Sequence, residues 1–393
     1  MSLQIDLIKA KSLKESIYTA ILSIILAIIT ILVMITIFNF YNLTLNMDNL
    51  IEYGVRDILS NPENIAGMLY WTTPLIFSGL AVAIAFKAGL FNIGGQGQMM
   101  IGGLFSAIWA AEIIPKSGIN FMNTKIFLIP TTILIGFIAG GIWGMIPGYL
   151  KAHRGAHEVI VTIMMNLLAI NVATYLIGSN SYSPFLDKTS KDAHSQTDKI
   201  SPEAQLQPLF PEVSSRLNIS LFLGVVLIIL IYILITKTNF GYKMRAVGLN
   251  SIAAESAGID TKKITTLTMA LSGGIAGLGG TFMVMGTYPF RYQIGMEGTL
   301  GFDGIAVSLI AQNSPFGILI AALFFGFLSQ SAYNIDIKTE DVPPDLLYIL
   351  QALVIIFAAT PLISKKIISQ LVYTKNFLKK KWNQASDPTE EKQ

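Results

Sequence analysis

The hydrophobic residues of this chain come in long blocks, most of them 16 to 25 residues, separated by polar or charged segments. A helix needs about 20 apolar residues to cross the hydrocarbon core of a bilayer. The pattern therefore predicts an all-α membrane protein with about ten transmembrane segments, at residues 17–38, 71–86, 98–113, 126–149, 159–178, 219–236, 264–286, 304–312, 316–333 and 346–363.

Two of these segments are shorter than the others. Residues 71–86 would span about 24 Å as a helix, less than the ~30 Å of the hydrocarbon core. Residues 304–312 are shorter still and are followed directly by Asn313, Ser314 and Pro315. Both segments are either broken or re-entrant, or they extend through their polar flanks.

The basic residues set the expected orientation. If all ten segments cross, 18 of the 27 Lys and Arg lie in 1–16, 87–97, 150–158, 237–263 and 364–393. Basic residues concentrate on the cytoplasmic side of membrane proteins. Both termini are therefore expected in the cytoplasm, and omitting either short segment would place a lysine-rich region outside.

This topology divides the chain into a cytoplasmic segment 1–16, a membrane domain 17–363 and a basic cytoplasmic tail 364–393. Within the membrane domain, the polar loop 179–218 is expected outside and the loop 237–263 inside. The tail is either a basic amphipathic helix on the anionic inner leaflet or only a signal for topology.

Composition excludes several kinds of site. Only 13% of the residues are charged, about half the usual share of a soluble domain, and 52% are hydrophobic. The absence of cysteine excludes disulfides, iron–sulfur clusters and thiolate zinc sites, and three histidines are too few for a histidine-rich metal centre. No Gly-Lys dipeptide occurs, so the chain has no phosphate-binding P-loop. No catalytic residue, metal site or nucleic-acid partner is expected.

Residues 88–103, AGLFNIGGQGQMMIGG, combine helix-weakening glycines with amides that are costly in lipid. An unwound backbone survives in a membrane only where protein or a water-filled cavity satisfies it. The segment is either a broken helix whose Asn92, Gln96 and Gln98 line a solute path, or a glycine-rich contact whose amides bridge neighbouring helices.

A second polar break, 287–303, contains Arg291, Gln293, Glu297 and Asp303 and precedes the other short segment. Paired interrupted segments indicate an internal repeat around a transport site, so a weak repeat is expected. Ion pairing at the outer mouth would explain Arg291 and Glu297 equally well. By contrast, the glycines at every fourth position of 126–149 (Gly136, Gly140, Gly144 and Gly148), like Gly273 and Gly277, favour close helix packing.

The loop 237–263 is the most informative cytoplasmic element. Asn250 or Ser251 is suited to cap a short helix that Gly258 would end. The helix is either a docking element for a partner or an ordinary turn.

Four blocks in order resemble a known family. They are AGLFNIGGQGQMMIGG (88–103), GAHEVIVTIMMNLLA (155–169), GYKMRAVGLNSIAAESAGI (241–259) and GFDGIAVSLIAQNSPFGI (301–318). They are similar to permease subunits of bacterial ABC importers of the branched-chain amino acid and simple-sugar type, and within that group to the larger permease of nucleoside uptake systems. The resemblance covers about residues 67–363.

The resemblance implies roles for particular residues. Asn92, Gln96, Gln98 and Asn166 fall in blocks near the solute pathway. The short helix corresponds to the coupling helix that inserts into the ATPase, with Gly248, Asn250, Ala253, Ala254 and Gly258 matching its pattern. Gly95-Gln96 departs from the family, where an acidic residue commonly follows a small one.

The resemblance also implies the assembly. The chain is expected to bind no cofactor itself, while a separate P-loop ATPase subunit uses ATP and Mg²⁺. A second, related permease, an extracytoplasmic solute-binding protein and membrane lipid are the other expected partners, in a prokaryotic cell membrane. The expected solute is a nucleoside, with a simple sugar or branched-chain amino acid as alternatives. An ion-coupled secondary transporter is disfavoured by the scarcity of acids and bases in the helices.

Overall fold

A computed structural model of the chain describes residues 52–178, 182–187, 195–211 and 216–338, together with Ile349 and Ala352. Both terminal segments, the expected span 17–38 and, apart from those two residues, the span 346–363 lie outside the described residues. Within the described ranges the chain is helical and has no β-strand beyond two isolated bridges, Gln196–Gln293 and Pro208–Asn218. The all-α class is thus confirmed for this part of the molecule.

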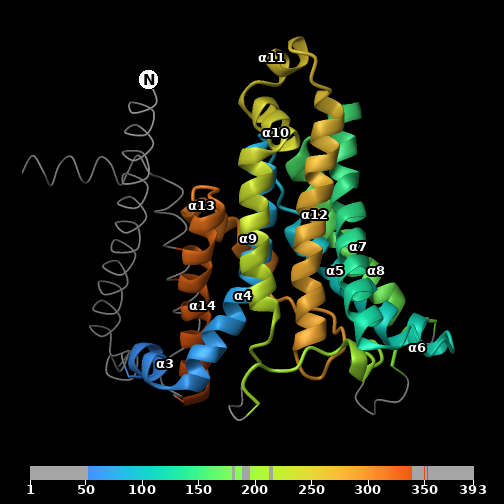
Figure 1. The fold of residues 1–393 in the computed structure, drawn as a ribbon, viewed down its shortest axis with the longest axis vertical. Coiled ribbons are helices and arrows are strands. Elements are labelled where there is room, and N and C mark those ends of the chain that lie inside the picture. Colours follow the sequence, from blue (N-terminus) through green and yellow to red (C-terminus); the bar gives the residue numbers. More distant parts are fainter. Residues whose placement is uncertain are drawn as a thin grey trace, which may run out of the picture. The chain divides into compact units, whose positions relative to one another are not determined.

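Seven helical segments of the described part are long and apolar enough to cross a membrane (Figure 1). They are α4 (Pro62–Lys87), the continuous segment of α5 (Gly95–Ile108), η2 (Trp109–Ile113) and α6 (Ile114–Lys116), α7 (Lys125–Arg154), α8 (Glu158–Ile177), α9 (Ser220–Lys237), α12 (Thr261–Gly286) and α14 (Pro315–Lys338). Shorter elements are η1 (Glu52–Arg56), α3 (Asp57–Ser60), η3 (Pro202–Ala204), α10 (Asn239–Leu249), α11 (Ser251–Ser256) and α13 (Leu300–Ile310). The total of ten spans stays a prediction.

The segment expected at 71–86 proves not to be short. The Asn61 side chain caps the helix by accepting a hydrogen bond from the Glu63 N–H at 3.0 Å, and Pro62 occupies the first position. In the polar flank, Asn64 donates to Asp57 Oδ2 at 2.8 Å and accepts from the Gln330 amide, so its side chain has partners and α4 extends to 26 residues. The second alternative, extension through polar flanks, is therefore correct here.

The other expected short segment does remain short. α13 has 11 residues and is about 16 Å long, roughly half the hydrocarbon thickness. A tight turn with Gln312 and Asn313 in the left-handed region (φ 51° and 56°) separates α13 from α14. The two are distinct helices rather than one kinked helix.

α4 and α12 form the centre of the bundle. In the most apolar window of α12, 83% of the residues are buried, compared with 28% in α7 and α9. The outer helices leave rows of Ile, Leu and Met exposed, as expected where they face lipid. α7 packs closely on α12 through glycines: a Cβ on Gly140 would lie 2.4 Å from the Gly273 carbonyl oxygen. The predicted packing role of these glycines is confirmed.

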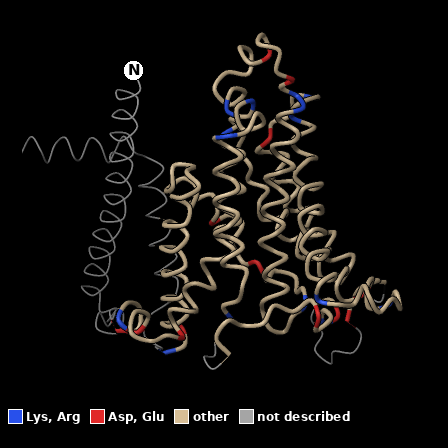
Figure 2. The backbone as a smooth tube through the Cα atoms, in the orientation of Figure 1, with Lys and Arg blue, Asp and Glu red and all other residues tan. Residues whose placement is uncertain are grey.

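The two ends of the bundle differ in charge. Figure 2 shows Lys and Arg gathered at the end that carries α10 and α11, and a mixture of acidic and basic residues at the opposite end. Basic residues concentrate on the cytoplasmic side of membrane proteins, so this distribution favours a cytoplasmic α10–α11 end. This agrees with the orientation expected from the sequence, which stays a prediction.

Candidate functional site

α5 and α13 both begin in the middle of the bundle. Gly304 of α13 packs on Ser78 of α4, where an added Cβ would lie 2.5 Å from the Ser78 Cβ. Ser78 is about 14 Å along α4 from its end at Lys87. A Cβ on Gly95, the first residue of α5, would lie 3.2 Å from the carbonyl oxygen of Gly301 in α13. The two helix N-termini thus meet at mid-depth, and we call this contact the half-helix junction.

A helix that begins inside a membrane needs partners for its first N–H groups, because water is absent. Asn92 supplies one: its Oδ1 accepts from the Gly94 N–H at 2.9 Å. The Asn92 amide donates to Gln98 Oε1 at 2.9 Å and to Ser272 Oγ at 2.8 Å, and Gln98 donates back to Asn92 Oδ1 at 3.1 Å. Ser272 in turn donates to the Ala81 carbonyl, which joins α5 to α12 and α4.

Asn166 of α8 supports the same helix start. Its Oδ1 accepts from the Gly97 N–H at 2.9 Å, and its amide donates to the Ile93 carbonyl at 3.0 Å. Gly97 permits this approach, because an added Cβ would lie 2.9 Å from Asn166 Oδ1. α8 is thereby attached to the non-helical segment 88–94 that leads into α5.

Gln96 connects the two half-helices. Its amide donates to the Gly298 carbonyl at 2.8 Å, and its Oε1 accepts from the Gly301 N–H at 2.9 Å. One side chain of α5 therefore holds the first turn of α13.

The structure brings all four predicted pathway residues together. Asn92, Gln96, Gln98 and Asn166 are buried, and each makes hydrogen bonds within the chain. In this conformation their amides therefore link neighbouring segments, as the second alternative expected. Their contact with a solute stays a prediction. The sequence did not reveal Ser272, because nothing in one sequence relates a serine among the glycines of α12 to an asparagine 180 residues away.

Glu297 is the unusual group at the junction. It is 1% exposed, and neither carboxylate oxygen has a hydrogen-bond partner. The hydroxyl of Tyr292, a fully buried residue beside it, is also without a partner. The expectation that ion pairing explains Arg291 and Glu297 is wrong for Glu297: Arg291 pairs with Asp187 instead, with Nη1 and Oδ2 2.5 Å apart.

A segment of the expected outer loop covers the approach to this junction. Residues 195–200 run antiparallel to 290–294, with Thr197 N–H donating to the Tyr292 carbonyl at 3.0 Å and Ile200 N–H to the Phe290 carbonyl at 2.9 Å. Ser201 N–H donates to the Ala110 carbonyl near the far end of α5. We call residues 195–201 the outer strap.

Acidic groups lie where the strap meets the bundle. Burial, and then the neighbouring carboxyl groups of Glu112 and Asp187, raises the pKa of Asp198 to about 6. The attachment of the strap is therefore sensitive to pH.

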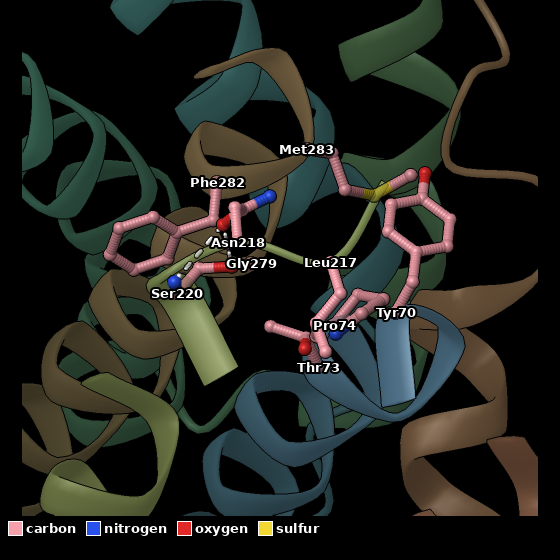
Figure 3. A pocket seen from close by; sticks show the side chains of 9 residues that line it. All are labelled: Tyr70, Thr73, Pro74, Leu217, Asn218, Ser220, Gly279, Phe282 and Met283. Carbon is pink, nitrogen blue, oxygen red and sulfur yellow. Dashed lines mark hydrogen bonds between the residues drawn. The ribbon is translucent and has the colours of Figure 1, made fainter. Parts of the chain in front are cut away.

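A small pocket lies between α4, α12 and the start of α9 (Figure 3). Its volume is about 10 Å³, enough for one water molecule. Tyr70 bonds Thr287 Oγ1 at 2.9 Å, and Asn218 accepts from the N–H and hydroxyl of Ser220. The pocket is closed to a solute of nucleoside size in this conformation.

The predicted surface helix is present at the α10–α11 end. Asn250 caps α11, its Oδ1 accepting from the Ala253 N–H at 3.0 Å, and Gly258 follows the helix with a left-handed φ of 81°. Ala254 is buried, whereas Ala253 and Asn250 are exposed. Ile252 is 77% exposed, which leaves an apolar side chain at the tip of the molecule.

Gly248 attaches this helix pair to the bundle. A Cβ there would lie 2.3 Å from the Lys87 carbonyl oxygen, and a Cβ on Gly89 would lie 3.2 Å from the Gly248 Cα. Beside this contact is a groove of about 490 Å³, lined by residues 88–90, 151–152, 247–252, Glu255 and the start of α12.

Comparison with known proteins identifies the family. The model described as "Branched-chain amino acid transport system / permease component" matches residues 64–359. The chain belongs to this permease family. It is accordingly a permease component of an ABC transporter and not an enzyme.

Relatives of the permease cover most of its length. The guanosine ABC transporter permease protein NupP of Bacillus subtilis is 37% identical over 73% of the chain and 78% of its own length. The nucleoside ABC transporter permease protein NupB of Lactococcus lactis is 34% identical over 79% and 84%. The glucose ABC transporter permease protein TsgB13 of Haloferax volcanii is 30% identical over 85% and 86%. No solved structure matches the permease.

Proposed function

We propose that this permease forms part of the membrane path of an ABC importer that brings nucleosides into a prokaryotic cell. A second, related permease chain would complete the path, and a solute-binding protein would deliver the solute at the strap end. A separate P-loop ATPase would use ATP and Mg²⁺ at the α10–α11 end. The observation that carries the choice of solute is the similarity to guanosine and nucleoside permeases over most of the chain.

The α10–α11 end supports the coupling role. The capped α11 presents Ile252 and Ala253 to solvent at the basic end, and Gly248 brings its base against the α4–α5 connection. Asn250 and Gly258 fix the two ends of the helix, and Ala254 packs beneath it. In this proposal these five positions hold an ATPase-coupling helix.

The packing of the helices supports an inverted repeat. α4, α5 and α7 alternate in direction, as do α12, α13 and α14, with the first helix of each set running in opposite directions. α5 and α7 pack on α12, while α13 and α14 pack on α4, and α4 contacts α12. The half-helix junction lies between the two sets, where repeat transporters place their solute. In this proposal the segments 17–38 and 346–363 complete ten spans, and both termini are cytoplasmic.

Uptake by the full transporter tests the proposed function. The permease, its second permease, ATPase and binding protein are reconstituted in liposomes, and ATP-dependent uptake of labelled guanosine, ribose and leucine is compared. The proposal expects guanosine uptake that needs ATP and survives the collapse of ion gradients. Uptake of ribose or leucine in place of guanosine would show that the proposed solute is wrong. Uptake driven by an ion gradient without ATP would contradict the proposal that the permease is part of an ABC importer.

A surface variant tests the coupling role separately. Ile252→Asp should lower co-purification of the ATPase with the permease roughly tenfold, because it places a charge in an apolar contact. Ile119→Asp, at an exposed apolar position of the opposite end, is the matched control. Equal recovery of the ATPase with both variants would contradict a docking role for α11.

A further inference from the structure

The Glu297 carboxyl makes no hydrogen bond of normal geometry in the described part of the chain, and only the Tyr292 hydroxyl and its own backbone N–H lie near it. Burying an acceptor without a good partner is unfavourable, and more so when the acceptor is charged. Acids in the interior of membrane proteins are rare, and their presence indicates function. The carboxyl groups of Asp57, Glu112, Glu158 and Asp187 each have a Lys or Arg partner, whereas Glu297 has none in the described part of the chain.

The position of Glu297 adds a second argument. It precedes α13 by three residues, and the Gly298 carbonyl that follows it accepts the amide of Gln96. It therefore lies at the half-helix junction, at mid-depth, with the outer strap paired to residues 290–294 on its outer side. The four amides of the junction have partners among other residues, whereas the Glu297 carboxyl and the Tyr292 hydroxyl have only each other as side-chain neighbours for hydrogen bonding.

Glycines flank Glu297 on both sides. Gly295 and Gly298 have left-handed φ values of 88° and 51°, and nothing lies within 4 Å of a Cβ added to either. The side chain of Gln96 makes both of the hydrogen bonds that hold the start of α13 against α5. Breaking these two bonds would release the start of α13 from Gln96, which is the step the inference below requires to uncover Glu297.

We propose that Glu297, assisted by Tyr292, binds the vicinal diol of the sugar ring of the solute when the half-helix junction opens. Two adjacent hydroxyls donate to the two carboxylate oxygens, and the Tyr292 hydroxyl bonds one of the sugar oxygens. The same pairing of a carboxylate with ribose hydroxyls occurs in dinucleotide-binding folds. This inference rests on the proposed solute class, and it makes Glu297 the residue that distinguishes ribose from deoxyribose.

The diol belongs to a nucleoside or to a free sugar, and uptake experiments separate the two sources. The full transporter in liposomes is given guanosine and 2′-deoxyguanosine, and in parallel ribose and 2-deoxyribose. A site that hydrogen-bonds a hydroxyl discriminates strongly against the analogue that lacks it. We expect wild-type kcat/KM to favour the diol-bearing member of the transported pair by roughly tenfold or more.

Three variants give the test. Glu297→Gln keeps the size of the side chain but removes its charge and one acceptor, so the ratio should fall to about one, mainly through KM for the diol-bearing solute. Tyr292→Phe removes one hydroxyl and should lower the ratio roughly threefold. Asp336→Asn, an exposed acid at the end of α14, is the matched control and should keep the wild-type ratio.

Each outcome is decisive. An unchanged ratio and KM in Glu297→Gln overturns the inference while leaving nucleoside transport intact. If Glu297→Gln fails to assemble with its partners, Tyr292→Phe decides, and an unchanged ratio in that variant overturns the inference. Wild-type transport of leucine, with neither diol-bearing solute carried, overturns the inference together with the proposed solute.

Discussion

The two half-helices that meet at mid-depth are anchored very differently. The start of α5 is capped by Asn92 and Asn166, which tie it to α12 and α8. The start of α13 is held against α5 by Gln96 alone, and it leaves Phe302 43% exposed. The comparison teaches that similar breaks in a membrane helix can be anchored to different degrees, and we expect α5 to be the fixed half-helix and α13, which also packs on α4 through Gly304, to be the one that moves more readily.

The largest effect should come from removing the anchor of α5. Asn92→Ala leaves the Gly94 N–H, the Gln98 amide and Ser272 without their partner in a region that water does not reach. We expect a loss of about 3–5 kcal/mol of stability. Thermal unfolding of the purified permease in detergent measures the loss. Asn171→Ala, which removes one exposed hydrogen bond within α8, should leave the midpoint unchanged. Equal midpoints for both variants would mean that α5 is not fixed through Asn92.

Adding a methyl group to each half-helix comes next. In Gly102→Ala the new Cβ would lie 2.3 Å from the Gly277 Cα, and in Gly304→Ala 2.5 Å from the Ser78 Cβ. Overpacking costs about 1–3 kcal/mol where the backbone cannot shift. We expect the full cost at Gly102, and a smaller cost at Gly304 because α13 shifts to relieve the contact. Thermal unfolding in detergent compares the two variants. A larger loss of stability in Gly304→Ala than in Gly102→Ala would show that α13, and not α5, is the more rigidly held half-helix.

Removing the hydrogen bonds of Gln96 between the two half-helices should loosen α13 but not α5. Gln96→Ala deletes two hydrogen bonds to α13, each worth about 1 kcal/mol. Hydrogen exchange of the backbone amides of 299–303 should accelerate roughly tenfold or more, while that of 98–104 stays unchanged. Gln293→Ala, which removes a bond to Gln196 in the outer strap, is the control. Faster exchange in both half-helices would show that they move together.

The smallest effect concerns the strap and the pH. The pKa of Asp198 is raised from its ordinary 3.8 to about 6 by burial and nearby carboxyl groups, so the attached strap binds a proton more tightly than the free one. Protonation of Asp198 therefore stabilises the attached strap fully below about pH 4, and this stabilisation is lost as the pH rises through about 6. We expect hydrogen exchange at Thr197 and Ile200, corrected for its intrinsic rate, to be severalfold faster at pH 7.5 than at pH 5. Asp198→Asn should remove this difference, and its persistence in the variant would assign it to another group.

Much of the fold follows from the sequence by simple physics. Long apolar blocks predict membrane helices, glycines at every fourth position predict the contact of α7 with α12, and Asn250 with Gly258 predicts α11 and its bounds. These features depend on neighbours along the chain or on composition. The length of α4 was underestimated because residues 62–70 include polar side chains such as Asn64, whose amide bonds Asp57 and Gln330 in the fold, and hydropathy does not register such partners.

The candidate site was only partly predictable. Glycines and amides marked both breaks, but which amide bonds which helix depends on contacts between residues as distant as Gln96 and Gly301. The same limit applies to the alternative that ion pairing explains Arg291 and Glu297, since the partner of Arg291 is Asp187, about 100 residues away in the sequence. That Glu297 is buried without an ion-pair partner could be recognised only from the folded structure.

The contact of Gly248 with Lys87 and Gly89 places backbone directly against backbone. Side chains between two elements yield by changing rotamer, but two main chains in contact have no such compliance. A displacement of α10 would therefore act directly on residues 87–89, at the beginning of the segment that carries Asn92. The stiffness of this backbone contact sets how far a force applied to α10 extends toward the middle of the membrane.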